Sequence, residues 1–148
     1  TMLIRKAIAN DISSIATFVK EANYRDWSRE EVYEELQRGW SRMWLLCDGE
    51  NKQILALLLY WQIGDHADIH DVLTHPQHRR CGYARALLQQ LFAELRYGSL
   101  KKITLEVREH NDAALSLYRD MGMICVGKRH KYYRDPEEDA LQMEISVS

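Results

Sequence analysis

The sequence predicts a single α/β domain, residues 1–148, in which a mixed and mostly antiparallel sheet is flanked by helices. Three observations favour this fold class. Segments whose apolar residues recur at helical spacing alternate with short apolar runs of strand length. The dipeptides Asp48-Gly49 and Gly64-Asp65, both typical of hairpin turns, join consecutive runs. Only one strand, helix and strand unit, near residues 67–107, requires a parallel crossover, and no repeat or Pro-, Gly- or Ser-rich linker divides the chain.

The first strand and two helices are predicted before residue 40. Leu3-Ile4 begins a short strand, and Asn10 or Asp11 is placed to cap a helix. The apolar residues of that helix recur at helical spacing: Ile12, Ile15 and Val19. Residues 28–31 have the S-x-x-E form of a capping box, so a second helix should begin there and end near Gly39. Its apolar face carries Val32 and Leu36.

The rest of the chain completes the order β-α-α-β-β-β-α-β-α-β-β. A long helix is predicted after Pro76, and it ends at Gly98. One apolar stripe runs along that helix: Ala84, Leu87, Leu88, Leu91 and Leu95. A shorter helix is expected over residues 112–121. Strands are expected over residues 43–47, 53–63, 67–74, 103–107, 123–127 and 141–147.

Composition and charge restrict the classes of function. Twenty Lys and Arg against 22 Asp and Glu give a net charge of −2, which is poor support for a general nucleic-acid binder. The longest apolar run, residues 54–61, is far shorter than the roughly 20 residues of a membrane helix. Cys47, Cys81 and Cys125 form no C-x-x-C pair, which argues against a disulfide framework or a zinc ribbon. With no secretion signal evident, we expect a cytoplasmic protein without a nucleic-acid or membrane partner.

The loop at residues 78–85 is the most informative segment, because it joins a predicted strand to the start of the long helix. Gly82 can adopt a left-handed backbone, and Ala84 keeps the first turn thin, so successive amides could point at an anion. Arg79, Arg80 and Arg85 add charge suited to a pyrophosphate. The loop matches neither G-x-G-x-x-G nor the P-loop pattern, and a basic helix start taken alone is more often a solvated turn than a ligand site.

In the order Arg79-Arg80-x-Gly82-x-Ala84, this loop resembles the Q/R-x-x-G-x-G/A loop of the GNAT acetyltransferases, whose order of elements is also the one predicted above. The resemblance continues along almost the whole chain, in Leu105-Glu106-Val107-Arg108, Asn111-x-x-Ala114-x-x-Leu117-Tyr118, Gly122-Met123, Tyr132-Tyr133-Arg134-Asp135 and Glu138-Asp139-Ala140-x-x-Met143. The tail segments and Trp27-Ser28 are similar to the RimI-type group of that family. Two departures from this group are Asp71, where Asn is usual, and the lack of Pro before Trp27.

The resemblance implies a GNAT fold that uses acetyl-CoA as co-substrate and needs no metal. By this resemblance the pyrophosphate is held by the loop residues Arg79, Arg80, Cys81, Gly82, Tyr83 and Ala84. The pantetheine and acetyl group face the backbone of Val72, Leu73 and Thr74, where the amide near Leu73 can stabilise an oxyanion. Asn111 hydrogen-bonds the pantetheine arm. Glu106 is the implied base, and Tyr118 the acid near the sulfur.

The implied reaction is direct transfer of acetyl to a primary amine, most of all the N-terminal α-amine of a protein. The RimI-type group points to a ribosomal protein that begins with alanine. The residues expected to bind the acceptor are Trp27, Asp68, His70, Tyr132 and Tyr133. Two alternatives stay open, which are a GNAT enzyme that acetylates lysine or a small amine, and a non-catalytic acyl-CoA sensor.

Each candidate residue also has a structural interpretation. Glu106 could pair with Arg108 or a lysine, and Tyr118 could be a core aromatic residue. His66, Asp68 and His70 alternate along one strand face, which suits an acceptor groove better than a tetrahedral metal site. Asp68 or His70 is then a second candidate base. Cys81 lacks an orienting partner for nucleophilic chemistry, and residues 128–131 form a basic run typical of a solvated strand end.

Overall fold

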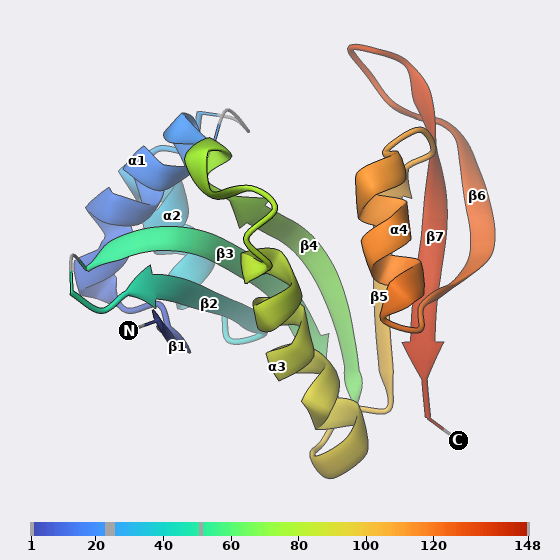
Figure 1. Ribbon diagram of the computed structural model, residues 1–148, viewed down its shortest axis with the longest axis horizontal. Helices are drawn as coiled ribbons and strands as arrows, with labels where there is room; N and C mark the ends of the chain where they lie inside the picture. Colours follow the sequence, from blue (N-terminus) through green and yellow to red (C-terminus); the bar gives the residue numbers. More distant parts are fainter. Residues whose placement is uncertain (1, 23–25, 51, 148) are drawn as a thin grey trace.

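The computed structural model describes residues 2–22, 26–50 and 52–147 (Figure 1). Its elements follow the predicted order, with two short 3₁₀ helices added at Ala9–Asp11 and Pro76–His78. The helices are α1 (Ile12–Glu21), α2 (Arg29–Gln37), α3 (Tyr83–Tyr97) and α4 (Asp112–Asp120). The strands are β1 (Met2–Lys6), β2 (Ser41–Asp48), β3 (Gln53–Ile63), β4 (His66–Thr74), β5 (Lys102–Arg108), β6 (Ile124–Tyr133) and β7 (Glu138–Ser146). The mixed α/β sheet is therefore confirmed.

The seven strands form one sheet in the order β1-β2-β3-β4-β5-β7-β6. The pair β4 and β5 is parallel, as predicted, and every other pair is antiparallel. Pairing between β4 and β5 covers only His66–Ile69 and Lys102–Leu105. At the same point β4 carries a bulge, because Ile69 pairs with Tyr60 and Asp71 with Leu59, so that His70 is the extra residue. Beyond the bulge the two strands separate (Figure 1).

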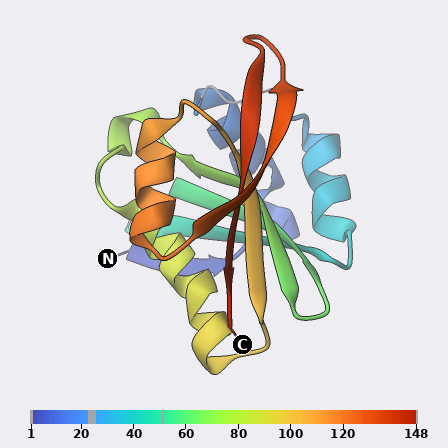
Figure 2. The same cartoon turned by 90° about the vertical axis from the view of Figure 1, so that its right-hand side faces the viewer.

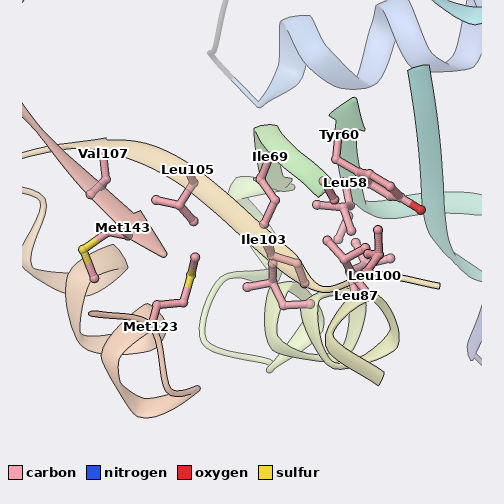
Figure 3. Packing of buried hydrophobic residues seen from close by; sticks show 14 of the residues in the cluster. Leu58, Tyr60, Ile69, Leu87, Leu100, Ile103, Leu105, Val107, Met123 and Met143 are labelled. Carbon is pink, nitrogen blue, oxygen red and sulfur yellow. The ribbon is translucent and has the colours of Figure 1, made fainter. Parts of the chain in front are cut away.

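Two hydrophobic layers fix the faces of the sheet. On β3, Leu57 and Leu59 pack with α1 and α2, while Leu58 and Tyr60 pack with α3. The second cluster continues across β5 to α4 and the C-terminal strands (Figure 3). Burying a leucine of this kind contributes roughly 1.5–3 kcal/mol. Because Ile103, Leu105 and Val107 point into the α3 and α4 layer, the alternate residues of β5 must face the other side.

The helix caps agree with the sequence at one position and differ at another. Ser28 and Glu31 form the predicted capping box, with both hydrogen bonds 3.1 Å long. Asp11 is the N-cap residue of α1, as predicted, but its carboxylate does not cap this helix, because it accepts a hydrogen bond from the N–H of Ile8 at 2.8 Å. The same carboxylate accepts two hydrogen bonds from Arg5, which hold the pKa of Asp11 below its usual range. Asp11 therefore ties α1 to β1 instead of capping the helix.

The C-terminal hairpin is longer than predicted. β6 continues to Tyr133, and β7 begins at Glu138, so both strands extend beyond the rest of the sheet (Figure 2). Two register shifts in β6 interrupt its alternation, which explains why sequence periodicity detected only residues 123–127. No helix in the described part of the chain is long and apolar enough to cross a membrane.

Candidate active site

Glu106 lies where β4 and β5 separate. It is the first residue of β5 after the last pair with β4, and it keeps its pair with Gln142 of β7. Its side chain points away from α3 and α4, into a groove of about 430 Å³ on the other face of the sheet. Residues from β3 to β7 line this groove, among them Trp61, Asp68, Thr104, Arg129 and Glu144. A carboxylate at this position can reach both the groove and the opening between the strands.

The opening leaves part of the β4 backbone without a strand partner on one side. Val72, Leu73 and Thr74 pair with β3, but none of them pairs with β5. Alternate residues of such a strand turn their N–H and C=O groups toward the missing neighbour. The segment therefore offers the hydrogen bonds that an extended chain with amide groups would need, which fits the predicted pantetheine contact.

Tyr118 lies on α4, on the face of the sheet opposite the groove. Its ring packs against the cluster formed with α3, and burial raises the pKa of its hydroxyl to about 12. The negative charge of an ionised Tyr133 adds to this rise in pKa. No described residue makes a hydrogen bond to the Tyr118 hydroxyl. This hydroxyl therefore keeps its proton at neutral pH and has it free to donate.

Tyr133 connects the two candidate catalytic groups. Burial raises its pKa, and the nearby carboxylate of Glu106 raises it further. The Arg108 guanidinium lies over the Tyr133 ring at 4.5 Å, and Tyr132 meets that ring edge-on at 5.1 Å. The charges of Glu106 and Tyr133 therefore influence the pKa values of Tyr133 and Tyr118 respectively, while the Tyr132 side chain is half exposed.

The loop before α3 has the backbone of an anion cradle. Gly82 has φ +78° and Arg80 has φ +65°, so two alternate positions are left-handed. The first helical hydrogen bond of α3 runs from Ala86 N to Gly82 O, which leaves the N–H groups of Tyr83, Ala84 and Arg85 without an intrahelical partner. A Cβ built on Gly82 meets no atom within 4 Å. Three free amides at the positive end of a helix, beside open space, fit a diphosphate.

The side chains of this loop differ in whether they have a partner. Arg79, Arg80 and Cys81 are exposed. Arg85, predicted from the sequence to add charge to the cradle, forms an ion pair with Asp120 of α4 at 3.1 Å. Asn111 caps α4 through Oδ1, which accepts from Ala114 N, so its amide NH₂ is the part of the side chain that a pantetheine arm could contact.

The residues predicted to bind the acceptor differ in whether they line the groove. Trp27 is only 7% exposed and belongs to the core formed with α1 and α2, so its packing does not support acceptor contact. Asp68 lines the groove, but Thr104 donates to it at 2.7 Å and His70 lies at 3.4 Å. His70 stacks on Trp61 at 4.2 Å. Within the described ranges, His, Cys, Asp and Glu side chains form no cluster of three suited to a metal.

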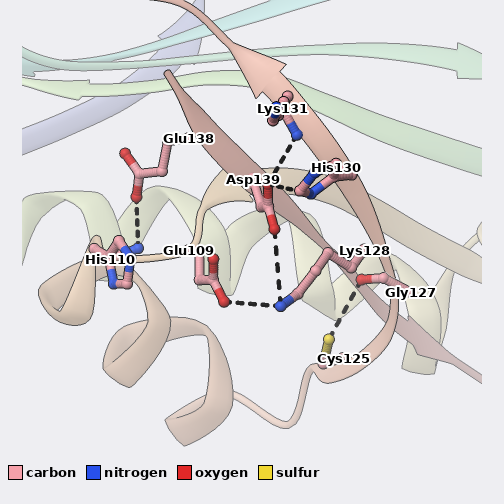
Figure 4. Close-up of polar contacts among 9 residues, drawn as sticks. All are labelled: Glu109, His110, Cys125, Gly127, Lys128, His130, Lys131, Glu138 and Asp139. Carbon is pink, nitrogen blue, oxygen red and sulfur yellow. Dashed lines mark hydrogen bonds and ion pairs between the residues drawn. The ribbon is translucent and has the colours of Figure 1, made fainter. Parts of the chain in front are cut away.

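The basic run at residues 128–131 contains a groove residue, Arg129, that the sequence analysis missed. Residues 128–131 are not simply solvated, since Lys128 pairs with Glu109 at 2.8 Å and His130 with Asp139 at 3.1 Å (Figure 4). Arg129 turns to the other face and reaches Glu106 Oε2 at 2.8 Å. Glu106 therefore pairs with neither Arg108 nor a lysine. Strand alternation would have suggested a groove-facing residue here, but the register shifts in β6 hide its position.

Comparison with known proteins identifies the family of this chain. The model of the acetyltransferase (GNAT) family matches residues 12–123. The [ribosomal protein bS18]-alanine N-acetyltransferase of Escherichia coli K12 is 33% identical over 101 residues, which are 67% of this chain and 68% of the relative. The N-alpha-acetyltransferase RimI of Mycobacterium tuberculosis is 41% identical over 76 residues, 51% of this chain and 46% of that protein.

Solved structures give the same result. The crystal structure of the ribosomal-protein-S18-alanine N-acetyltransferase from Escherichia coli superimposes with a TM-score of 0.88 and 27% identity, over 100% of this chain and 95% of the other. The chain belongs to the GNAT family and is an acetyl-CoA-dependent N-acetyltransferase, related to the RimI enzymes. This finding confirms the family, the fold and the reaction class predicted from the sequence.

The burial of Tyr118 predicts a measurable titration. Phenolate absorbance is measured against pH in the wild type and in Tyr118→Phe. The difference between the two curves should show one phenol with a pKa of about 12 instead of about 10. Because the folded protein binds this proton more tightly than the unfolded chain, the contribution of Tyr118 to stability is complete below about pH 10. That contribution is lost as the pH rises through 12. A difference titration centred near pH 10 would contradict the burial.

Proposed function

We propose that this enzyme acetylates the N-terminal α-amine of a protein, and that the acceptor is a ribosomal protein that begins with alanine. The observation that carries the proposal is the position of Glu106, which faces the groove at the first point where β4 and β5 separate. The names of the relatives supply the acceptor class. Acetyl-CoA and ribosomes both belong to the cytoplasm, where we place the reaction.

Glu106 has the role of general base in this proposal. A peptide α-amine has an ordinary pKa of about 7.7–8.0, against about 10.4 for lysine, so a carboxylate needs to remove a proton from only part of the acceptor population. The groove brings Asp68 and Glu144 to the same face, which favours a cationic acceptor over an anionic one. Asp68 remains the second candidate base, acting through the same groove.

Tyr118 has the role of general acid. It belongs to the α4 side of the sheet and Glu106 to the groove side, so base and acid serve the two sides of the opening. Acetyl-CoA supplies the acetyl group as a thioester. With its pKa raised to about 12, the hydroxyl is protonated at neutral pH, so it has a proton with which to hydrogen-bond and stabilise the departing thiolate. The backbone N–H near Leu73 is the proposed donor to the carbonyl oxygen.

The loop residues hold the co-substrate in this proposal. The amides that follow Gly82 and the exposed side chains of Arg79 and Arg80 bind the diphosphate, with Cys81, Tyr83 and Ala84 contributing backbone. Val72, Leu73 and Thr74 bind the pantetheine by adding it as a strand beside β4. Asn111 contacts the same arm, and Tyr132 and Tyr133 border the acceptor.

The acceptor is tested with two synthetic peptides of the same sequence. One begins with a free alanine α-amine, and the other has that amine blocked and carries an internal lysine. We expect release of the CoA thiol only with the free α-amine, because the lysine amine is almost fully protonated at neutral pH. Thiol release with the blocked peptide alone would move the activity to lysine.

Glu106→Gln tests the base. Removing the carboxylate while keeping the side-chain shape should lower kcat/KM for the alanine peptide by about 10²–10⁴, the range typical of general base catalysis. The matched control is Glu109→Gln, a neighbouring carboxylate paired with Lys128, which should change kcat/KM little. If Glu106→Gln keeps nearly full activity, the base is Asp68 or His70.

Gly82→Val tests the cradle. Valine rarely adopts φ near +78°, so the loop should leave its left-handed conformation and turn its amides away from the phosphates. We expect the dissociation constant for CoA, measured by calorimetry, to rise at least about tenfold. Gly39→Val is the control, since a Cβ at Gly39 also meets no atom within 4 Å but needs no positive φ. Equal CoA affinity in the wild type and Gly82→Val would count against the cradle.

A further inference from the structure

The carboxylates of the groove differ in how they are satisfied. Asp68 accepts a hydrogen bond from Thr104, and Glu144 pairs with Lys102 at 3.6 Å. Glu106 Oε2 is buried and accepts no hydrogen bond from the described residues. A buried carboxylate oxygen without a hydrogen bond is costly unless a positive charge compensates it. Glu106 Oε2 is therefore a carboxylate oxygen of the groove that accepts no hydrogen bond from the described residues and needs a positive charge beside it.

Arg129 supplies the compensating charge. Its Nε lies 2.8 Å from Glu106 Oε2, across β7, yet the contact lacks the geometry of a hydrogen bond. The Arg129 side chain is 53% exposed and lines the groove. Its guanidinium also lies over the Tyr132 ring at 5.4 Å. Arg129 therefore makes an ion pair with Glu106 and a cation–π contact with Tyr132, and neither contact is a hydrogen bond.

This pair occupies the place that the acceptor needs. An α-amine arrives largely as an ammonium, which is also a cationic N–H donor. Glu106 Oε2 is buried with Arg129 Nε 2.8 Å away, so the ammonium can reach this oxygen only if Arg129 moves. An arginine keeps its proton at any physiological pH, so it cannot be the group that Glu106 deprotonates. For Glu106 to act as base on the acceptor, Arg129 must move aside.

We propose that Arg129 is a positioning residue that holds the place of the acceptor amine in the free enzyme. When the acceptor ammonium enters the groove, it replaces Arg129 beside Glu106 Oε2, and the guanidinium stays over Tyr132. The inference rests on the proposed function, because it requires an amine acceptor and Glu106 as base. Its consequence is that Arg129 competes with the acceptor, so the arginine weakens acceptor binding while it protects the empty site from other cations.

The test compares Arg129→Gln with Arg129→Lys. The glutamine removes the charge, and the lysine keeps a cation on a flexible stem. An exposed ion pair is worth about 0.2–1 kcal/mol, so Arg129→Gln should lower KM for the alanine peptide by about 1.5- to 5-fold. The KM for acetyl-CoA and the value of kcat should not change, and Arg129→Lys should restore most of the higher KM. Lys131→Gln is the matched control, since Lys131 lies on the same strand and pairs only loosely with Glu137, at 3.8 Å.

A second measurement follows the arginine directly. The Arg129 Nε–H resonance, assigned by its loss in Arg129→Gln, should shift when the alanine peptide is added together with CoA, and not with CoA alone. The inference is overturned if Arg129→Gln raises or keeps the KM for the peptide, or if Lys131→Gln lowers it equally. If the wild type acetylates no α-amine, the proposed function fails and this inference fails with it. A wild type that acetylates the peptide while its Nε–H resonance stays unchanged refutes the inference alone.

Discussion

The candidate active site depends on the point at which β4 and β5 stop sharing hydrogen bonds. Their pairing ends at Ile69 and Leu105, where the extra residue His70 shifts the register of β4. Had the pairing continued, the backbone of Val72–Thr74 would be saturated and Glu106 would lie inside a closed sheet. The separation is stable because α3 and α4 pack on the same face of both strands and hold them through one continuous hydrophobic cluster. The hydrophobic cluster thus holds the two strands in place, while the backbone groups of Val72–Thr74 on this side keep no strand partner.

The proposed base and acid lie in two different environments. Tyr118 lies on the α4 side, where burial keeps its hydroxyl protonated. Glu106 lies on the groove side, where Arg129 Nε lies 2.8 Å from its carboxylate in the free enzyme. A base must be charged and an acid neutral at the same pH, and one sheet with a buried and an open face provides both conditions. Tyr133, whose pKa is raised by the Glu106 carboxylate and which in turn raises the pKa of Tyr118, is placed by the long C-terminal hairpin.

The sequence predicted the order of elements, the crossover and the left-handed Gly82, because each has a local signal in hydrophobic period, turn residues or a single glycine. The capping box at Ser28 was equally local. The side-chain partners were not predictable in this way. Asp11 accepts hydrogen bonds from Arg5, Arg85 forms an ion pair with Asp120, and Arg129 forms an ion pair with Glu106. In each case the partner comes from another element. The bulge at His70 and the register shifts of β6 also interrupt the alternation on which strand-face predictions depend.

The claim on which the account depends most is that co-substrate binds at the open edge of β4 and the loop before α3. Backbone amide NMR during titration with CoA measures this directly. The account predicts that the largest shifts fall on residues 72–74 and on residues 81–85, with smaller shifts at Asn111 and Tyr118. Shifts confined to the α1 and α2 side of the molecule, or saturating shifts that leave residues 72–74 and 81–85 unchanged, would contradict it.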